Sequence, residues 1–172
     1  MQHPWDSQQF QTGAKAAGRS RETIEAAIAI GRNIKRTNAD LPVVLTLHHL
    51  SHLCDISAEF LQDVIFRKVD AYRAFRVQKR GKANALPRPA RRFRTICVPD
   101  PLLMQTQRWI AQNILNAVKP HEASFAFAKG RDLVGAANKH AGARWLVKMD
   151  VRSFFESISE RQVYFVFRRL GY

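Results

Sequence analysis

The first part of the chain carries apolar residues at the spacing of an amphipathic helix. Ser20 is of a type that commonly caps a helix, and apolar or small residues recur after it every three or four positions, at Ile24, Ile28, Gly31 and Ile34. The run 38–42, which ends in proline, terminates this predicted helix. Residues 1–19 show no such period, and we expect them to stay mobile until a partner binds them.

Two shorter helical patterns follow, over 46–54 and 57–69. A pair of leucine-rich helices joined by a tight turn resembles the helix-turn-helix motif that reads DNA, and it also arises from ordinary helix packing. The first turn of the second helix offers Glu59 and Gln62, whereas a recognition helix is expected to direct Arg, Lys, Asn or Gln at DNA. The second helix thus argues against DNA reading, and a non-enzymatic DNA-binding regulator is kept as the alternative hypothesis for this chain.

The pattern changes to alternation over 72–79 and again over 93–98, which predicts two strands. The run 80–92 between them is polar and contains one glycine and two prolines, so it cannot pair throughout. We therefore predict a hairpin with a long basic tip. Asp100 followed by Pro101 is the preferred order for a helix start, and this helix should end at Lys119-Pro120.

The last third of the chain predicts a helix over 130–141, a buried strand and a final helix. The strand is the apolar run 145–149, which places Asp150 at its C-terminal end. Ser157 and Glu160 match a capping box that begins the last helix. That helix ends at Gly171.

Composition and charge point to a polyanionic partner. Of 172 residues, 28 are Lys or Arg and 14 are Asp or Glu, which gives a net charge of +14. The apolar share of 46%, with 8 Gly and 7 Pro, excludes collagen-like, low-complexity and disulfide-scaffold proteins. Eleven basic residues and one acidic residue lie between Arg67 and Arg94, interleaved with Tyr72, Phe75 and Phe93. This cluster favours contact with nucleic acid over the alternative, a solvated charged surface.

The same sequence predicts a protein of the cytoplasm without a membrane anchor. No stretch approaches the roughly 20 apolar residues that a spanning helix needs. Residues 1–18 carry no apolar run of signal-peptide type. Cys54 and Cys97 are then free thiols, and the alternation around Cys97 predicts that it is buried.

The segment 148–158 carries the candidate chemistry. A carboxylate at the end of a buried strand, here Asp150, can bind a divalent metal ion that the backbone carbonyl of Val151 also reaches. Mg²⁺ suits this arrangement, because it takes oxygen ligands octahedrally and prefers one or two carboxylates with substrate phosphates and water. The alternative is that Asp150 only begins a helix.

Several blocks in one order resemble bacterial reverse transcriptases of the retron type, from about residue 41 onward. The matching blocks are 72–80 (YRAFRVQKR), 94–99 (RTICVP), 107–110 (QRWI), 124–127 (SFAF) with Gly130, and 148–158 (KMDVRSFFESI), leading to Val163 and Gly171-Tyr172. The resemblance implies an α/β (α+β) fold. Residues 41–144 would form the fingers of a right-hand polymerase and 145–172 the first, incomplete part of its palm, after a helical, partly disordered N-terminal extension over 1–40.

The resemblance also implies an activity and its partners. The parent enzyme would be an RNA-directed DNA polymerase that uses an RNA template, a DNA primer, dNTP and Mg²⁺. In retrons it copies a structured non-coding RNA from the same locus, often in antiviral (phage) defence, where an effector protein is a further partner. Group II intron enzymes are a close second within the same chemistry.

Roles for individual residues follow from the resemblance. Asp150 matches the first metal-binding carboxylate of the palm, and Val151 would lend its carbonyl to the same ions. Phe155 matches the aromatic residue under the dNTP sugar that excludes a 2′-hydroxyl. Arg94 matches the fingers arginine that lies against the triphosphate, and Lys79 resembles the lysine at its terminal phosphate. Planar guanidinium donors suit phosphates, and phosphoryl-type transfer needs mainly alignment and positive charge.

Four further basic residues are candidates for contact with the template or primer backbone: Arg80, Lys82, Lys129 and Arg131. Family members usually have Ser where this chain has Asp132 and Asn where it has Ala136. The Tyr-x-Asp-Asp motif is absent, and one carboxylate cannot hold two Mg²⁺ ions beside the attacking and leaving oxygens. We therefore expect that this chain alone does not polymerise. It is then either the front piece of a longer or split enzyme, with a C-terminal half as one partner to consider, or a truncated fragment.

Overall fold

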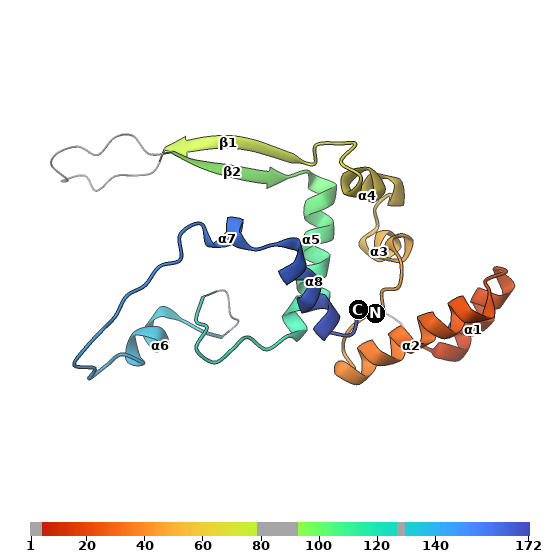
Figure 1. Cartoon of the computed structure of the whole chain (residues 1–172), viewed down its shortest axis with the longest axis horizontal. Helices are drawn as coiled ribbons and strands as arrows, with labels where there is room; N and C mark the ends of the chain where they lie inside the picture. The colour runs from red at the N-terminus through yellow and green to blue at the C-terminus, as the bar shows by residue number, and fades with distance from the viewer. Residues whose placement is uncertain (1–4, 79–92, 127–129) are drawn as a thin grey trace. The chain divides into compact units, whose positions relative to one another are not determined.

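The computed structural model describes residues 5–78, 93–126 and 130–172, and the chain divides into two compact units. One unit combines the chain up to Val43 with Leu115–Tyr172, and the other is Val44–Ile114. The elements, labelled in Figure 1, are α1 (Ser7–Ala16), α2 (Arg21–Thr37), α3 (Leu47–Cys54), α4 (Ala58–Ile65), β1 (Tyr72–Gln78), β2 (Phe93–Pro99), α5 (Pro101–Asn113), the 3₁₀ turn η1 (Leu115–Ala117), α6 (Leu133–Asn138), α7 (Phe154–Ser157) and α8 (Glu160–Arg169). Helices with a small antiparallel sheet agree with the predicted α+β class. The predicted boundaries at residues 40 and 144 stay predictions.

The first unit has its core where α2 meets the C-terminal end of the chain. Helix α2 begins as predicted, because the Ser20 hydroxyl accepts a hydrogen bond from the Thr23 amide at 3.3 Å. Ile24 and Ile34 on its inner face are buried, as is Leu41 just beyond it. The Asn33 side-chain amide donates to the carbonyl of Gly171 at 3.3 Å. The N-terminal extension therefore packs with residues from the opposite end of the chain.

Helix α1 corrects the prediction that residues 1–19 have no fixed structure. The Asp6 carboxylate caps it by accepting from the Gln8 amide at 2.8 Å. The Trp5 ring lies against Gly31 of α2, where an added Cβ would be 2.5 Å from the ring. The sequence of α1 has no apolar stripe, and accordingly none of its residues is buried. The helix is instead placed by its contact with α2.

In the second unit, α3 and α4 form the predicted helix pair. Thr46 and Ser57 cap them, accepting from the amides of His49 and Phe60 at 3.1 and 3.3 Å. The turn between them has Asp55 in the left-handed region at φ 55°. Helix α4 ends at Ile65 rather than at the predicted residue 69. Its backbone turns away there through a left-handed residue that follows the C-cap.

The hairpin forms as predicted from two antiparallel strands. Tyr72 pairs with Pro99 at its base and Gln78 with Phe93 at its far end. The Asp100 amide donates to the carbonyl of Ala71 at 2.7 Å, and the Asp100 carboxylate then caps α5. Cys97 is exposed, contrary to the prediction, because among the described residues no element covers its face of this two-stranded sheet.

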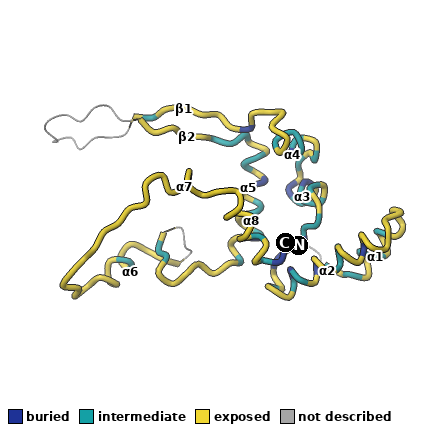
Figure 2. Tube along the Cα trace, viewed as in Figure 1, coloured by how far each residue is buried: buried dark blue, intermediate teal, exposed yellow. Residues whose placement is uncertain are grey.

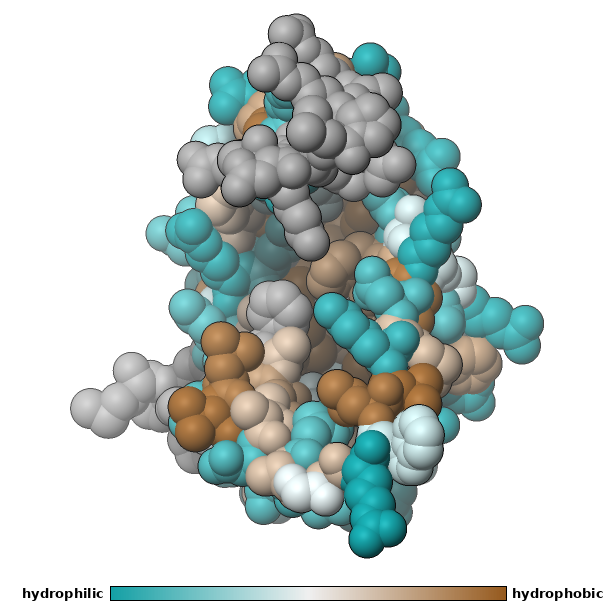
Figure 3. Space-filling model, turned by 90° about the vertical axis from the view of Figure 1, so that its left-hand side faces the viewer, coloured by the Kyte–Doolittle hydropathy of each residue, from teal (hydrophilic) through white to brown (hydrophobic). Residues whose placement is uncertain are grey.

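The predicted strand over 145–149 is not formed. All residues from 137 to 166 are exposed, which Figure 2 shows as a continuous yellow segment. Trp145 is 90% exposed and Met149 88%. A strand needs a neighbouring strand to form hydrogen bonds with its backbone N–H and C=O groups. The apolar pattern of this segment suits a strand inside a sheet, and the described residues provide no neighbouring strand for it. Figure 3 shows hydrophobic side chains at the surface of one face.

The last helices differ from prediction in their ends. Helix α6 covers only part of the predicted range 130–141, because the Asp132 carboxylate accepts from the Gly135 amide at 2.6 Å and sets a later start. The capping box joins Ser159 and Gln162 instead of Ser157 and Glu160. Among the helices in the part of the chain that the structure describes, none combines the length and hydropathy of a membrane span.

Candidate functional site

Arg94 lies on the hairpin, on one defined face of the sheet. It pairs with Val77, so both side chains share a face, and Phe75 and Ile96 lie on that face one step along each strand. The neighbouring pair of Arg76 and Thr95 belongs to the opposite face. Arg94 is exposed. The hairpin therefore presents a guanidinium above an apolar strip, an arrangement that can receive a phosphate group.

Four of the predicted basic contacts lie outside the described residues. Lys79, Arg80 and Lys82 belong to the segment 79–92, and Lys129 to the segment 127–129. Their roles stay predictions. Within the described part of the hairpin, basic side chains are present on both faces, with Arg73 and Arg94 on one and Arg76 on the other.

Asp150 and Val151 lie in an extended, exposed segment rather than at the end of a strand. Val151 is 63% exposed. Within the described residues, the amides of 144–152 donate to no backbone carbonyl, and no group of three His, Cys, Asp or Glu side chains gathers around a metal position. One carboxylate and a backbone carbonyl match the oxygen preference of Mg²⁺ in kind, but they are too few to enclose the ion.

Phe155 lies next to this segment in the short helix α7. Its side chain is 74% exposed and meets Phe154 edge to face, with ring centroids 5.4 Å apart and planes at 69°. Phe154 is 53% exposed. Nothing in the described residues buries either ring, and the predicted role of Phe155 stays a prediction. Ser153, before them, has a left-handed backbone at φ 51°.

Arg131 is held within its own loop. Its guanidinium donates to the carbonyl of Glu122 at 3.0 Å and lies over the Phe125 ring, 5.2 Å from the centroid. Gly130 before it has φ +75°, a conformation that glycine adopts without strain. The loop thus fixes the position of Arg131, while its predicted contact with template or primer stays a prediction.

The helix pair that raised the regulator hypothesis has an acidic second helix. Helix α4 carries Glu59 in its first turn, and its Asp63 pairs with Lys68 at 3.2 Å. The pair is tied to α5 by the Gln105 side-chain amide, which donates to the carbonyl of Cys54 at 2.7 Å. Acidic groups at this position repel DNA phosphates, which argues against DNA binding by α4. The helix pair instead packs against α5.

The predicted site residues fall into both compact units. Arg94 belongs to the unit 44–114, whereas Asp150, Val151 and Phe155 belong to the other. The last three lie close together in one short segment of the sequence. The contact between Asn33 and Gly171 had no signal in the sequence, because local periodicity does not report which distant segments meet.

Comparisons with known proteins match the chain to reverse transcriptases of retrons. No family model matches the chain. Over 135 residues, or 78% of its length, the chain is 34% identical to the retron Ec86 reverse transcriptase of Escherichia coli, and this match covers 40% of that relative. It is 37% identical over 78 residues to the retron Mx162 reverse transcriptase of Myxococcus xanthus, covering 45% of the chain and 16% of the relative.

A third match is the retron Ec73 reverse transcriptase of Escherichia coli, 32% identical over 79 residues, 45% of the chain and 25% of the relative. The chain thus spans no more than 40% of the length of these curated relatives. The matches agree with the resemblance described above and with an N-terminal region of such proteins. They do not favour the DNA-binding regulator.

Proposed function

The chain is a homologue of retron reverse transcriptases, and we propose that it forms the fingers and the first palm segment of an RNA-directed DNA polymerase. In this role it contacts the RNA template, the DNA primer and the incoming dNTP. The observation that carries the proposal is the 34% identity over 135 residues, which includes most of the chain. The charge of +14 supports a polyanionic partner.

Arg94 contributes positive charge to the triphosphate of the dNTP. Arg94 is exposed on the face of the hairpin that includes Phe75 and Ile96. This exposure supports the role, because an exposed guanidinium can donate two parallel hydrogen bonds to phosphate oxygens. Lys79 would reach the terminal phosphate. Transfer of a nucleotidyl group then relies on positioning and on stabilising the charge that develops on the phosphate.

Asp150 and Val151 would hold Mg²⁺ through the carboxylate and the backbone carbonyl. The bound ion would supply charge neutralisation at the dNTP phosphates. Both oxygens are of the kind that Mg²⁺ prefers, and the exposed backbone of 144–152 leaves them accessible. Phe155, three quarters exposed beside them, would lie under the sugar and exclude a 2′-hydroxyl.

The chain would need further palm residues to act. The segment 145–149 carries the sequence pattern of a buried strand, yet its Trp145 and Met149 side chains are about nine-tenths exposed. An added strand would cover these side chains, pair with their backbone and bring the carboxylates that a two-metal site requires. We therefore assign the chain no polymerase activity alone and expect activity once the rest of a palm is supplied.

Replacing the matching region of the retron Ec86 reverse transcriptase with this chain tests the proposal. The product, called the chimera below, is compared with the chain alone in primer extension on an RNA template with Mg²⁺ and dNTP. We expect DNA synthesis by the chimera and none by the chain. A chimera that folds, by its circular dichroism and melting, but extends no primer would contradict the proposal, as would synthesis by the isolated chain.

A further inference from the structure

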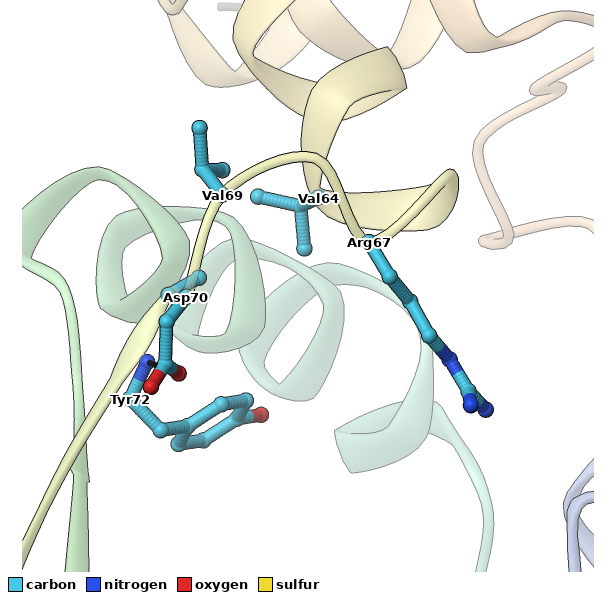
Figure 4. Close-up of a pocket in the computed structure, with 6 residues that line it drawn as sticks. Val64, Arg67, Val69, Asp70 and Tyr72 are labelled. Atoms are coloured by element: carbon cyan, nitrogen blue, oxygen red, sulfur yellow. Dashed lines mark hydrogen bonds between the residues drawn. The ribbon is translucent and has the colours of Figure 1, made fainter.

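A groove of about 410 Å³ opens beside the loop that joins α4 to β1, away from the residues assigned above. Figure 4 shows it between the side chains of Arg67 and Tyr72, which leave the two ends of this loop, with Val64 between them. Val69, Asp70 and Ala71 complete its lining. All these residues belong to the unit 44–114, so the groove is formed within one compact unit.

Arg67 occupies a position where glycine is favoured. Its φ is 56°, and the hydrogen bonds at the end of α4 run from its own amide to Val64 at 3.1 Å and from the Lys68 amide to Asp63 at 2.8 Å. This is the pattern of a helix C-terminus that usually has glycine at the left-handed position. Among the described residues the salt bridges are Arg21 with Glu25 and Lys68 with Asp63, so the Arg67 guanidinium has no carboxylate partner there.

Tyr72 presents an aromatic ring that is fixed in place and still accessible. The Gln107 side-chain amide donates to its hydroxyl at 2.8 Å, and its backbone amide donates to the Asp70 carboxylate at 3.2 Å. The side chain nevertheless remains 44% exposed. A ring held before binding loses little entropy when a flat ligand stacks on it. Phe66 and Ile65, 70% and 59% exposed, extend the apolar surface of this loop region.

We propose that this groove binds one nucleotide of a single-stranded RNA segment, with the base stacked on Tyr72 and its phosphate on Arg67. The proposal rests on the proposed function, which makes RNA the polyanion that this basic unit meets. A fixed aromatic ring beside an unpaired guanidinium is the combination that single-stranded nucleic acid selects. The Asp70 carboxylate repels phosphate and accepts hydrogen bonds from base N–H groups, which orients the base toward Asp70 and the phosphate toward Arg67.

The variant Arg67→Gly separates binding from folding. Glycine adopts the left-handed backbone conformation without strain, so we expect Arg67→Gly to raise the melting temperature. Loss of the guanidinium should weaken RNA binding about tenfold. The probe is a labelled oligouridylate of about 12 nucleotides, titrated with the full chain in fluorescence anisotropy. The slope of log K against log salt should fall by about 0.7, as for one lost phosphate contact. Arg32→Ala, at an exposed position of α2, removes the same charge and should change affinity less than about twofold.

A second pair of variants tests the ring. Tyr72→Leu keeps an apolar side chain but removes the stacking surface, and affinity should fall about 5- to 150-fold. Tyr72→Phe keeps the ring and loses only the hydroxyl that accepts from Gln107, so affinity should stay within about threefold of the wild-type value. Melting curves of both variants confirm that the chain is folded at the temperature of the titration.

Several outcomes would overturn the groove assignment. These are a wild-type chain that does not bind the oligouridylate, an Arg67→Gly chain with unchanged affinity, or equal losses in Tyr72→Phe and Tyr72→Leu. Displacement of the RNA by polyglutamate at equal charge concentration would instead identify an acidic protein segment as the occupant and overturn the assignment too. Primer extension by the chimera reports separately on the proposed function, so DNA synthesis with a failed groove test rejects the groove alone.

Discussion

Gly171, near the C-terminal end of the chain, lies directly against Ile34 of α2. A Cβ added at Gly171 would be 2.8 Å from the Ile34 Cα, closer than backbone and side chain can approach without a shift. The same residue has φ +97°, and its carbonyl accepts from the Asn33 side chain. The segment after α8 is therefore held by the N-terminal extension through a contact that only glycine permits.

Gly171→Ala should destabilise the chain by about 2–4 kcal/mol, because a left-handed backbone strains alanine and the methyl group meets backbone at Ile34. Urea unfolding followed by circular dichroism measures this change. Gly142→Ala is the matched control, since Gly142 has φ +79° and nothing within 4 Å of an added Cβ. The control should lose only about 1–2 kcal/mol. Equal losses in the two variants would mean that the contact with Ile34 contributes nothing.

Tyr172 makes stability depend on alkaline pH. Its hydroxyl donates to the carbonyl of Pro42 at 2.6 Å, and burial raises the pKa of Tyr172 from 10.0 to about 12. A raised pKa means that the folded state keeps the proton that the unfolded state loses above pH 10. This stabilisation is fully present below pH 10 and is lost as the pH rises toward 12.

Tyr172→Phe removes both the hydrogen bond and this titration. We expect it to lower the free energy of unfolding by about 1 kcal/mol at pH 7 and to flatten its pH dependence between pH 10 and pH 12. Unfolding in urea at several pH values, compared with the wild-type chain, cancels the titration of other groups. An identical alkaline slope in both proteins would refute the role of Tyr172.

Arg94→Ala in the chimera should lower kcat/KM for dNTP about 10- to 150-fold, because a charge-assisted contact to the triphosphate is lost. Arg94→Lys keeps the charge without the planar fork and should give an intermediate loss. Arg76→Ala is the control on the opposite face of the same hairpin and should change kcat/KM less than about threefold. Steady-state primer extension measures all three. Equal losses for Arg76 and Arg94 would indicate a general charge effect.

Phe155→Val in the chimera should raise incorporation of ribonucleotides relative to deoxyribonucleotides about tenfold or more, because a smaller side chain admits a 2′-hydroxyl. Phe154→Val is the paired control, since Phe154 contacts Phe155 edge to face. Competition between rNTP and dNTP in primer extension reads out the ratio. A shift of the ratio in Phe154→Val with none in Phe155→Val would contradict the assignment of Phe155.

Features encoded within a few residues of each other could be predicted from the sequence. The caps at Ser20 and Asp100 each depend on one side chain and an amide two or three positions on, and both form as expected. The hairpin follows from alternation in two adjacent runs. The same pattern places Arg94 on the hairpin, whereas its role at the dNTP comes from the resemblance and stays a prediction.

Features that depend on distant partners could not be predicted. Helix α1 has no apolar stripe and is recognised only through Trp5 lying against Gly31. The side-chain pattern of the run 145–149 predicts a buried strand. Such a pattern indicates which environment a segment is suited to, and it does not indicate whether neighbouring strands are present. For the same reason Asp150 was expected at the end of a strand, whereas it lies in an exposed extended segment.

In the proposed function, Asp150 supplies a metal-binding carboxylate of a polymerase. Primer extension by the chimera carrying Asp150→Asn measures this most directly, with Glu156→Gln, an exposed carboxylate six residues on, as the control. We expect Asp150→Asn to lower DNA synthesis about a thousandfold or more at saturating Mg²⁺, while Glu156→Gln stays within about threefold of the unmodified chimera. Synthesis by the Asp150→Asn chimera at the rate of the control would contradict this role of Asp150.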